Sequence, residues 1–172
     1  MLSGISMVVA ALLAATASRG FAQANSAGSG STTGALPTWA WDQCLGGLTY
    51  GQPFKLALSY GGGLLHESTS GGADVCVFGA AKLGFGAARG SIGIGRSKGP
   101  LGSGVALNAG IMRTFGGAWG ASPSRTYIGA GLNVWPLLGL GGEIGYYVRL
   151  GDRSGEPNRQ RRIITWSAGF GF

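Results

Sequence analysis

Four charged side chains lie in segments that are otherwise rich in large apolar residues. Lys55, Lys82, Glu143 and Arg149 each occur where large apolar residues alternate with Gly, Ser or Asn, and each falls on the small, polar side of that alternation. A lone charge removed from water is costly, so these groups should pair, with Glu143 bound to Arg149 or to a lysine. Such a set predicts either a polar pore or proton path, or an ion-pair network that only fills space.

Two cysteines, Cys44 and Cys76, and one histidine are the other candidates for chemistry. In an exported chain, a pair of cysteines favours a disulfide in an oxidising compartment. Two Cys and one His without a suitable spacing do not make a zinc site. We therefore expect a Cys44–Cys76 disulfide, no bound metal and no cofactor.

The adjacent residues His66, Glu67 and Ser68 are of the types that hydrolases use. Successive residues of an extended segment point to opposite sides, so Glu67 cannot easily join His66 and Ser68. The Ser, Thr and Gly residues around them are typical of a turn. Nothing indicates a base oriented by a third group, and we predict no catalytic residue.

The elements that position these residues are strands, because the dominant pattern is strict period-two alternation. It is clearest in the last ten residues, IITWSAGFGF. Small or polar residues, with Ile163 as the one large exception, alternate there with apolar ones: Ile164, Trp166, Ala168, Phe170 and Phe172. A tilted strand of about ten residues is long enough to cross a bilayer as part of a closed barrel.

Six earlier segments alternate in the same way, and bacterial single-chain barrels have an even number of strands. An eighth strand should therefore come from residues 39–50, which contain Trp39, Trp41 and Tyr50. The alternating segments are 54–64, 75–87, 89–97, 104–115, 126–135, 140–150 and 163–172.

The final aromatic, with apolar residues at every second position before it, resembles the C-terminal assembly signal of bacterial outer-membrane β-barrels. Residues 39–172 resemble the small barrels of the OmpA/OmpX or opacity type in their alternation. The resemblance implies an all-β fold, an antiparallel up-and-down transmembrane β-barrel of eight strands without a periplasmic domain. It also implies a monomer that the outer-membrane barrel assembly machinery inserts, with loops 116–125 and 151–160 outside and 136–139 as a periplasmic turn.

The first 24 residues are typical of a cleaved signal peptide, with an apolar run followed by the small-x-small pattern Ala22-Gln23-Ala24. Residues 25–38 are a flexible linker rich in Gly, Ser and Thr. The rest, 39–172, would be the barrel, and the chain would reach the outer membrane after export.

Composition agrees with this organisation. The 36 glycines follow no three-residue period, which excludes collagen, and 45% hydrophobic against 11% charged residues is too apolar for a disordered chain. The mean hydropathy is +0.24, yet no continuous apolar run after the N-terminus reaches the length of a transmembrane helix. A formal net charge of +7 fits anionic lipid better than nucleic acid, since the basic residues are scattered.

Four arginines, Arg153, Arg159, Arg161 and Arg162, cluster in and after the most polar loop. Their forked donors suit the phosphates of lipopolysaccharide, although a solvated loop would look the same. The function expected from the sequence is a structural or surface-interaction barrel without catalysis. A lipid-modifying outer-membrane enzyme, a narrow channel and a secreted soluble β-sandwich are the alternatives.

Overall fold

A computed structural model describes residues 39–68, 72–98, 103–137, 139–151 and 161–171. The predicted signal peptide (1–24) and linker (25–38) lie outside the described residues. So do Arg153, Arg159 and Phe172. No helix in the described part of the chain is long and apolar enough to cross a membrane.

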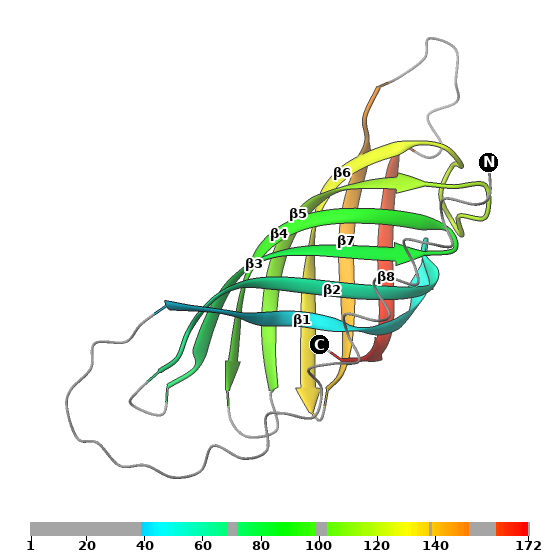
Figure 1. Cartoon of the computed structure of the whole chain (residues 1–172). Coiled ribbons are helices and arrows are strands. Elements are labelled where there is room, and N and C mark those ends of the chain that lie inside the picture. The colour runs from blue at the N-terminus through cyan, green and yellow to red at the C-terminus, as the bar shows by residue number, and fades with distance from the viewer. Residues whose placement is uncertain (1–38, 69–71, 99–102, 138, 152–160, 172) are drawn as a thin grey trace, which may run out of the picture. The chain divides into compact units, whose positions relative to one another are not determined.

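Eight antiparallel strands form a closed barrel in which each strand pairs with the next and β8 returns to β1 (Figure 1). This confirms the predicted all-β, up-and-down architecture. The strands are β1 (Trp39–Gln52), β2 (Lys55–His66), β3 (Asp74–Gly84), β4 (Ala87–Lys98), β5 (Ser103–Thr114), β6 (Thr126–Leu137), β7 (Leu140–Arg149) and β8 (Arg162–Phe170).

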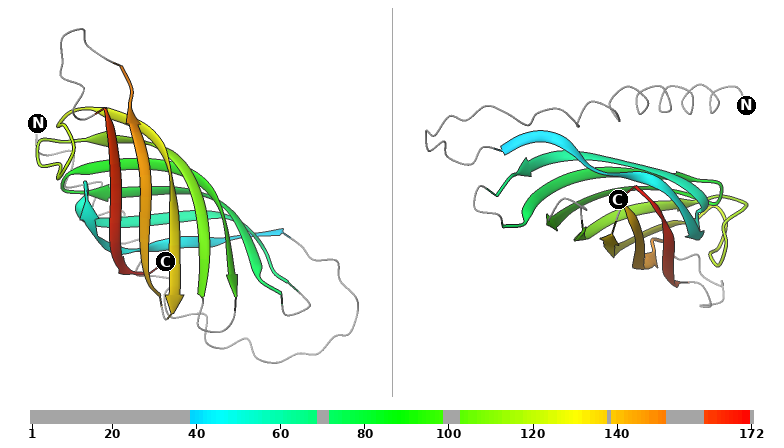
Figure 2. Two further views of the ribbon diagram at one scale, coloured as in Figure 1. Left: turned by 180° about the vertical axis from the view of Figure 1, so that it is seen from behind. Right: turned by 90° about the horizontal axis from the view of Figure 1, so that it is seen from below.

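The barrel has two ends, which we name by what lies there. The loop rim carries the connections β1–β2, β3–β4, β5–β6 and β7–β8, and the last two of these, 115–125 and 150–161, are the longest. The terminal rim carries the start of β1, the end of β8 and the other three connections. The two views of Figure 2 show the steep tilt of the strands between these ends.

The strand boundary that differs most from the prediction is the end of β3. The segment expected as a single strand over 75–87 ends at Gly84, and Phe85 and Gly86 turn the chain into β4. A Cβ on Gly86 would collide with the carbonyl oxygen of Pro53, so glycine is needed for the close approach. Ala87, expected on the outer face, starts β4 and is fully buried.

The two faces of the barrel wall have opposite character. Exposed large hydrophobic residues occur on the outer face of every strand, for example Ile92, Leu107 and Ile144. Buried polar and charged residues face the interior, among them Asn108, Glu143 and Thr165. The period-two alternation of the sequence therefore becomes an apolar exterior around a partly polar interior.

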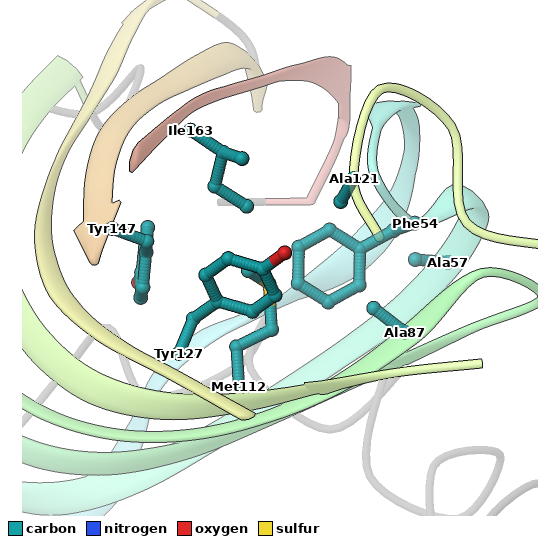
Figure 3. Close-up of a cluster of buried hydrophobic side chains, with 8 residues drawn as sticks. All are labelled: Phe54, Ala57, Ala87, Met112, Ala121, Tyr127, Tyr147 and Ile163. Carbon is teal, nitrogen blue, oxygen red and sulfur yellow. The ribbon is translucent and has the colours of Figure 1, made fainter. Parts of the chain in front are cut away.

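Two apolar clusters fill parts of the interior. The upper cluster, near the loop rim, comprises Phe54, Ala57, Ala87, Met112, Ala121, Tyr127, Tyr147 and Ile163, and Figure 3 shows the rings of Phe54, Tyr127 and Tyr147 among them. The lower cluster, toward the terminal rim, comprises Leu45, Cys76, Phe78, Ala106 and Trp135.

Candidate functional site

A cluster of three ionised side chains lies between the two apolar clusters, inside the barrel. Lys82 Nζ lies 3.1 Å from Glu143 Oε2. Arg89 makes a two-pronged pair with the same carboxylate, through Nη1 to Oε1 and through Nη2 to Oε2 at 3.0 Å. Forked guanidinium–carboxylate pairing is the strongest common form of ion pair. We call these three residues the interior ion cluster.

Neighbouring side chains hold the two cations in place. The ammonium of Lys82 donates to Ser167 Oγ at 2.7 Å, and Arg89 Nη1 donates to the Tyr147 hydroxyl at 3.2 Å. The ring of Phe54 lies 5.0 Å from Lys82 Nζ and 5.7 Å from Arg89 Cζ. Cations over an aromatic face are attracted by its quadrupole. The upper cluster is thus continuous with the interior ion cluster.

Strand tilt explains why these residues meet. Lys82 and Arg89 lie near the loop-rim ends of β3 and β4, whereas Glu143 lies near the terminal-rim end of β7. In a closed barrel the strands tilt and their register staggers around the ring. The stagger brings opposite ends of distant strands to the same level.

The predicted interior charges divide into two groups. Lys82, Glu143 and Arg149 are buried on the inner side of the barrel, whereas Lys55 is exposed at the start of β2, with a φ of 60°. The interior position predicted for Lys55 is therefore wrong, because the strand begins at this residue and its side chain leaves at the rim. Arg149 lies six residues beyond Glu143, about 20 Å along the strand. Of the two predicted pairings of Glu143, the one with a lysine is confirmed, since the carboxylate pairs with Lys82 and also with Arg89.

Arg89 was missed by the sequence analysis. It shares the alternation of Ser91, Gly93 and Gly95, which was correctly expected on the small side. It was passed over because it stood at the edge of its predicted strand, next to a turn that the alternation did not reveal. Arg89 is the first residue of the segment 89–97 and has the same parity as Ser91, so the alternation alone places it inside the barrel.

The predicted disulfide is present in the structure. Cys44 of β1 and Cys76 of β3 are joined, with their Cα atoms 6.2 Å apart. The disulfide spans β2, which lies between those strands. It borders a cavity of about 150 Å³ near the terminal rim, lined also by Phe78, Arg96 and Trp135.

His66, Glu67 and Ser68 do not form a catalytic arrangement. The ring of His66 contacts that of Trp39 in a tilted arrangement, with ring centroids 5.1 Å apart. The hydroxyl of Ser68 accepts a hydrogen bond from the backbone N–H of Gly72. The backbone N–H of Ser68 donates to Asp74 Oδ1. These bonds join Ser68 to Gly72 and Asp74 between β2 and β3.

The remaining predicted residues lie on the outside. Ile164, Trp166, Ala168 and Phe170 are all exposed on the outer face of β8, and Arg161 and Arg162 are exposed at the loop rim. Among the described residues, no group of His, Cys, Asp and Glu could hold a metal ion. The interior can bind and pair charges, and the two apolar clusters lie on either side of the interior ion cluster.

Comparisons with known proteins give no family or relative for this chain. No protein-family model, no curated protein and no solved structure matches the chain significantly. The fold and the opposite character of the two faces of the barrel wall are therefore the basis for a functional proposal.

Proposed function

We propose that this protein is a small barrel of the bacterial outer membrane, with a structural or surface-interaction role and no catalysis. The observation that carries the proposal is the inverted wall, which is apolar outside and partly polar inside. Large hydrophobic residues such as Leu107 are more than half exposed, at 61%. Soluble monomers rarely expose contiguous apolar surface of this extent.

A bilayer would accommodate this surface. In lipid, every backbone polar group needs a partner within the protein, and a closed barrel provides one because it has no sheet edge across the membrane. Charged residues on the outer face of the described strands lie near the rims. Arg96 and Lys98 lie near the terminal rim, and Arg113 and Arg162 near the loop rim. Such long side chains can reach the headgroups.

Aromatic residues lie at both boundaries of the apolar band. Trp119 contacts Tyr50 and Trp166 near the loop rim, with centroid separations of 6.4 Å and 5.9 Å. Trp41 is exposed near the terminal rim. Trp41 and Tyr50 are nine residues apart on β1, about 30 Å along the strand. At the tilt usual for such barrels this corresponds to about 22 Å, close to the ~25 Å apolar band of outer-membrane proteins.

The basic loop rim suggests the orientation and the partner. Lys55, Arg113, Arg125, Arg161 and Arg162 lie there, whereas Asp42, Glu67 and Asp74, the described acids outside the barrel interior, lie toward the terminal rim. A loop rim that faces outward would meet the phosphates of lipopolysaccharide. Replacing Arg161 and Arg162 by Gln should then reduce lipopolysaccharide co-purification, and unchanged lipid content would remove this partner.

The C-terminal strand would serve insertion. Its exposed apolar residues have the spacing that resembles the assembly signal, so we propose that the barrel assembly machinery recognises β8. The proposal includes a monomer, since lipid can cover the outer face of a closed barrel without a second copy. The alternatives of a lipid-modifying enzyme and a narrow channel have less support, given the hydrogen bonds that Ser68 makes to Gly72 and Asp74 and the apolar cluster that fills the interior near the loop rim.

A substitution at the middle of the outer face tests the membrane location. Leu107→Arg should destabilise the barrel in lipid vesicles by about 2–4 kcal/mol, because arginine at the bilayer midplane is costly on the lipid face. Leu150→Arg, an exposed position at the loop rim, is the matched control and should cost about 0–1 kcal/mol. Urea unfolding in vesicles measures both. A protein that folds without lipid or detergent, with both variants equally stable, would contradict the proposal.

A further inference from the structure

The interior ion cluster contains more positive than negative charge. Lys82 and Arg89 are 3% and 7% exposed, and the single carboxylate of Glu143 compensates both. The other described acids, Asp42, Glu67 and Asp74, lie toward the terminal rim. A buried charge without compensation is costly, so this part of the interior favours an additional negative charge.

A cavity of about 20 Å³ adjoins the cluster. It is lined by Lys82, Arg89 and Glu143 and by polar residues of three further strands and of β4: Ser59, Ser91, Asn108 and Asn133. Gly131 contributes to the room, since a Cβ there would lie 3.1 Å from Glu143 Oε1 and 3.3 Å from Asn108 Oδ1. The volume corresponds to about one or two water-sized spheres.

Two buried amides at this cavity have unused hydrogen-bonding groups. Asn108 and Asn133 are each 4% exposed. Neither side-chain polar atom of Asn108 has a partner, and Oδ1 of Asn133 has none. Buried polar groups in proteins are nearly always paired, so these atoms, one donor and two acceptors, point to a bound water or ion in the cavity. An amide N–H2 and two nearby cations together form a donor set for an anion.

We propose that this cavity binds one small monovalent inorganic anion of halide size, held by Lys82, Arg89 and Asn108. The anion balances the second buried cation and accepts the unused amide donor. Its size is limited by the cavity, which excludes organic anions. The site is internal, so the inference goes beyond the proposed function and does not depend on which surface partner the barrel has.

Thermal unfolding of the refolded full-length protein tests the proposal. The unfolding midpoint is measured by circular dichroism at constant ionic strength while sodium chloride or bromide replaces sodium gluconate. A ligand that binds only the folded state stabilises it, and we expect the midpoint to rise by roughly 3 °C. An equal midpoint in halide and gluconate would overturn the site.

Variants separate the site from general salt effects. Lys82→Met leaves Arg89 balanced by Glu143, so the halide shift should be lost. Glu143→Gln should enlarge it, because it removes the competing carboxylate. Thr165→Val is the matched control: Thr165 is buried and its hydroxyl has no partner, but it does not line the cavity, so its halide shift should equal that of the parent protein. An undiminished shift in Lys82→Met, or a smaller one in Glu143→Gln, would contradict the assignment.

A direct measurement covers the case in which a variant does not fold. Crystals of the unmodified protein grown in sodium bromide should show an anomalous scattering peak in the cavity beside Lys82 and Asn108. Water density without an anomalous peak at this position would overturn the proposal.

Discussion

The interior near the loop rim contains eight buried apolar residues, whereas five such residues, a disulfide and a cavity of about 150 Å³ occupy the interior toward the terminal rim. The upper cluster includes two fully buried tyrosines, Tyr127 and Tyr147. It lies beside the short turns β1–β2 and β3–β4 and the loop of residues 115–125. The lower cluster lies where β1 lacks one neighbour, since β8 pairs only with residues 48–52. Packing holds the upper half, and a covalent bond supplements packing in the lower half.

Truncating one phenylalanine in each half should give the largest effects. Phe54→Ala removes a ring that packs in the upper cluster and covers both buried cations, so we expect a loss of about 4–5 kcal/mol. Phe78→Ala, the matched change, borders an existing cavity and should cost about 3 kcal/mol. Urea unfolding in the same detergent measures both. A larger loss for Phe78→Ala would reverse the comparison.

Removing the disulfide should lower the stability less than Phe54→Ala does, and the effect should be localised. The double variant Cys44→Ser/Cys76→Ser should lose about 3.7 kcal/mol, the value expected from loop-closure entropy for cysteines 32 residues apart. Amide hydrogen exchange should accelerate mainly in the terminal-rim half of β1 and in the paired part of β2. The unmodified protein treated with reductant is the control and should behave alike. Equal acceleration at both rims would show that the bond does not act locally.

The loop of residues 115–125 offers the smallest change. Thr114 is fully buried, and its hydroxyl donates to the carbonyl oxygen of Ser122 at 2.6 Å and accepts the N–H of Arg125 at 3.0 Å. Thr114→Val keeps the shape but removes both bonds, so a loss of about 1–2 kcal/mol and faster proteolysis of the loop are expected. Thr126→Val removes only an exposed bond from Arg113 and should stay within about 0.5 kcal/mol. Similar losses for the two variants would contradict a structural role for the Thr114 hydroxyl.

Alternation allowed much of the fold to be predicted. It placed Ile164, Trp166, Ala168 and Phe170 outside and Lys82 and Glu143 inside, because the side of a strand on which a residue lies depends only on whether its position is odd or even. It did not locate the turn at Phe85 and Gly86. Those two residues continue the same large-small pattern, so the strand prediction ran past them to Ala87.

Partners within the interior required information that parity does not contain. Which residues face each other across a barrel depends on the stagger of eight strands. The sequence therefore suggested Arg149 or a lysine as the partner of Glu143. The lysine is confirmed as Lys82, whereas Arg89, which reaches the carboxylate from across the barrel, was not foreseen. The position of Lys55 failed for a related reason, since parity does not tell where a strand emerges at the rim.

The junction of β1 with β8 also bears on how the chain folds. It contains five residue pairs, from Leu48 with Phe170 to Gln52 with Trp166, whereas the hairpins of the ring join segments that are close in sequence. Pairings between distant segments form late because the entropy of loop closure opposes them. We therefore expect the ring to close last at this joint. Before closure the chain would be a curled sheet with two open edges and an uncovered ion cluster, and we expect that stage to be its most vulnerable.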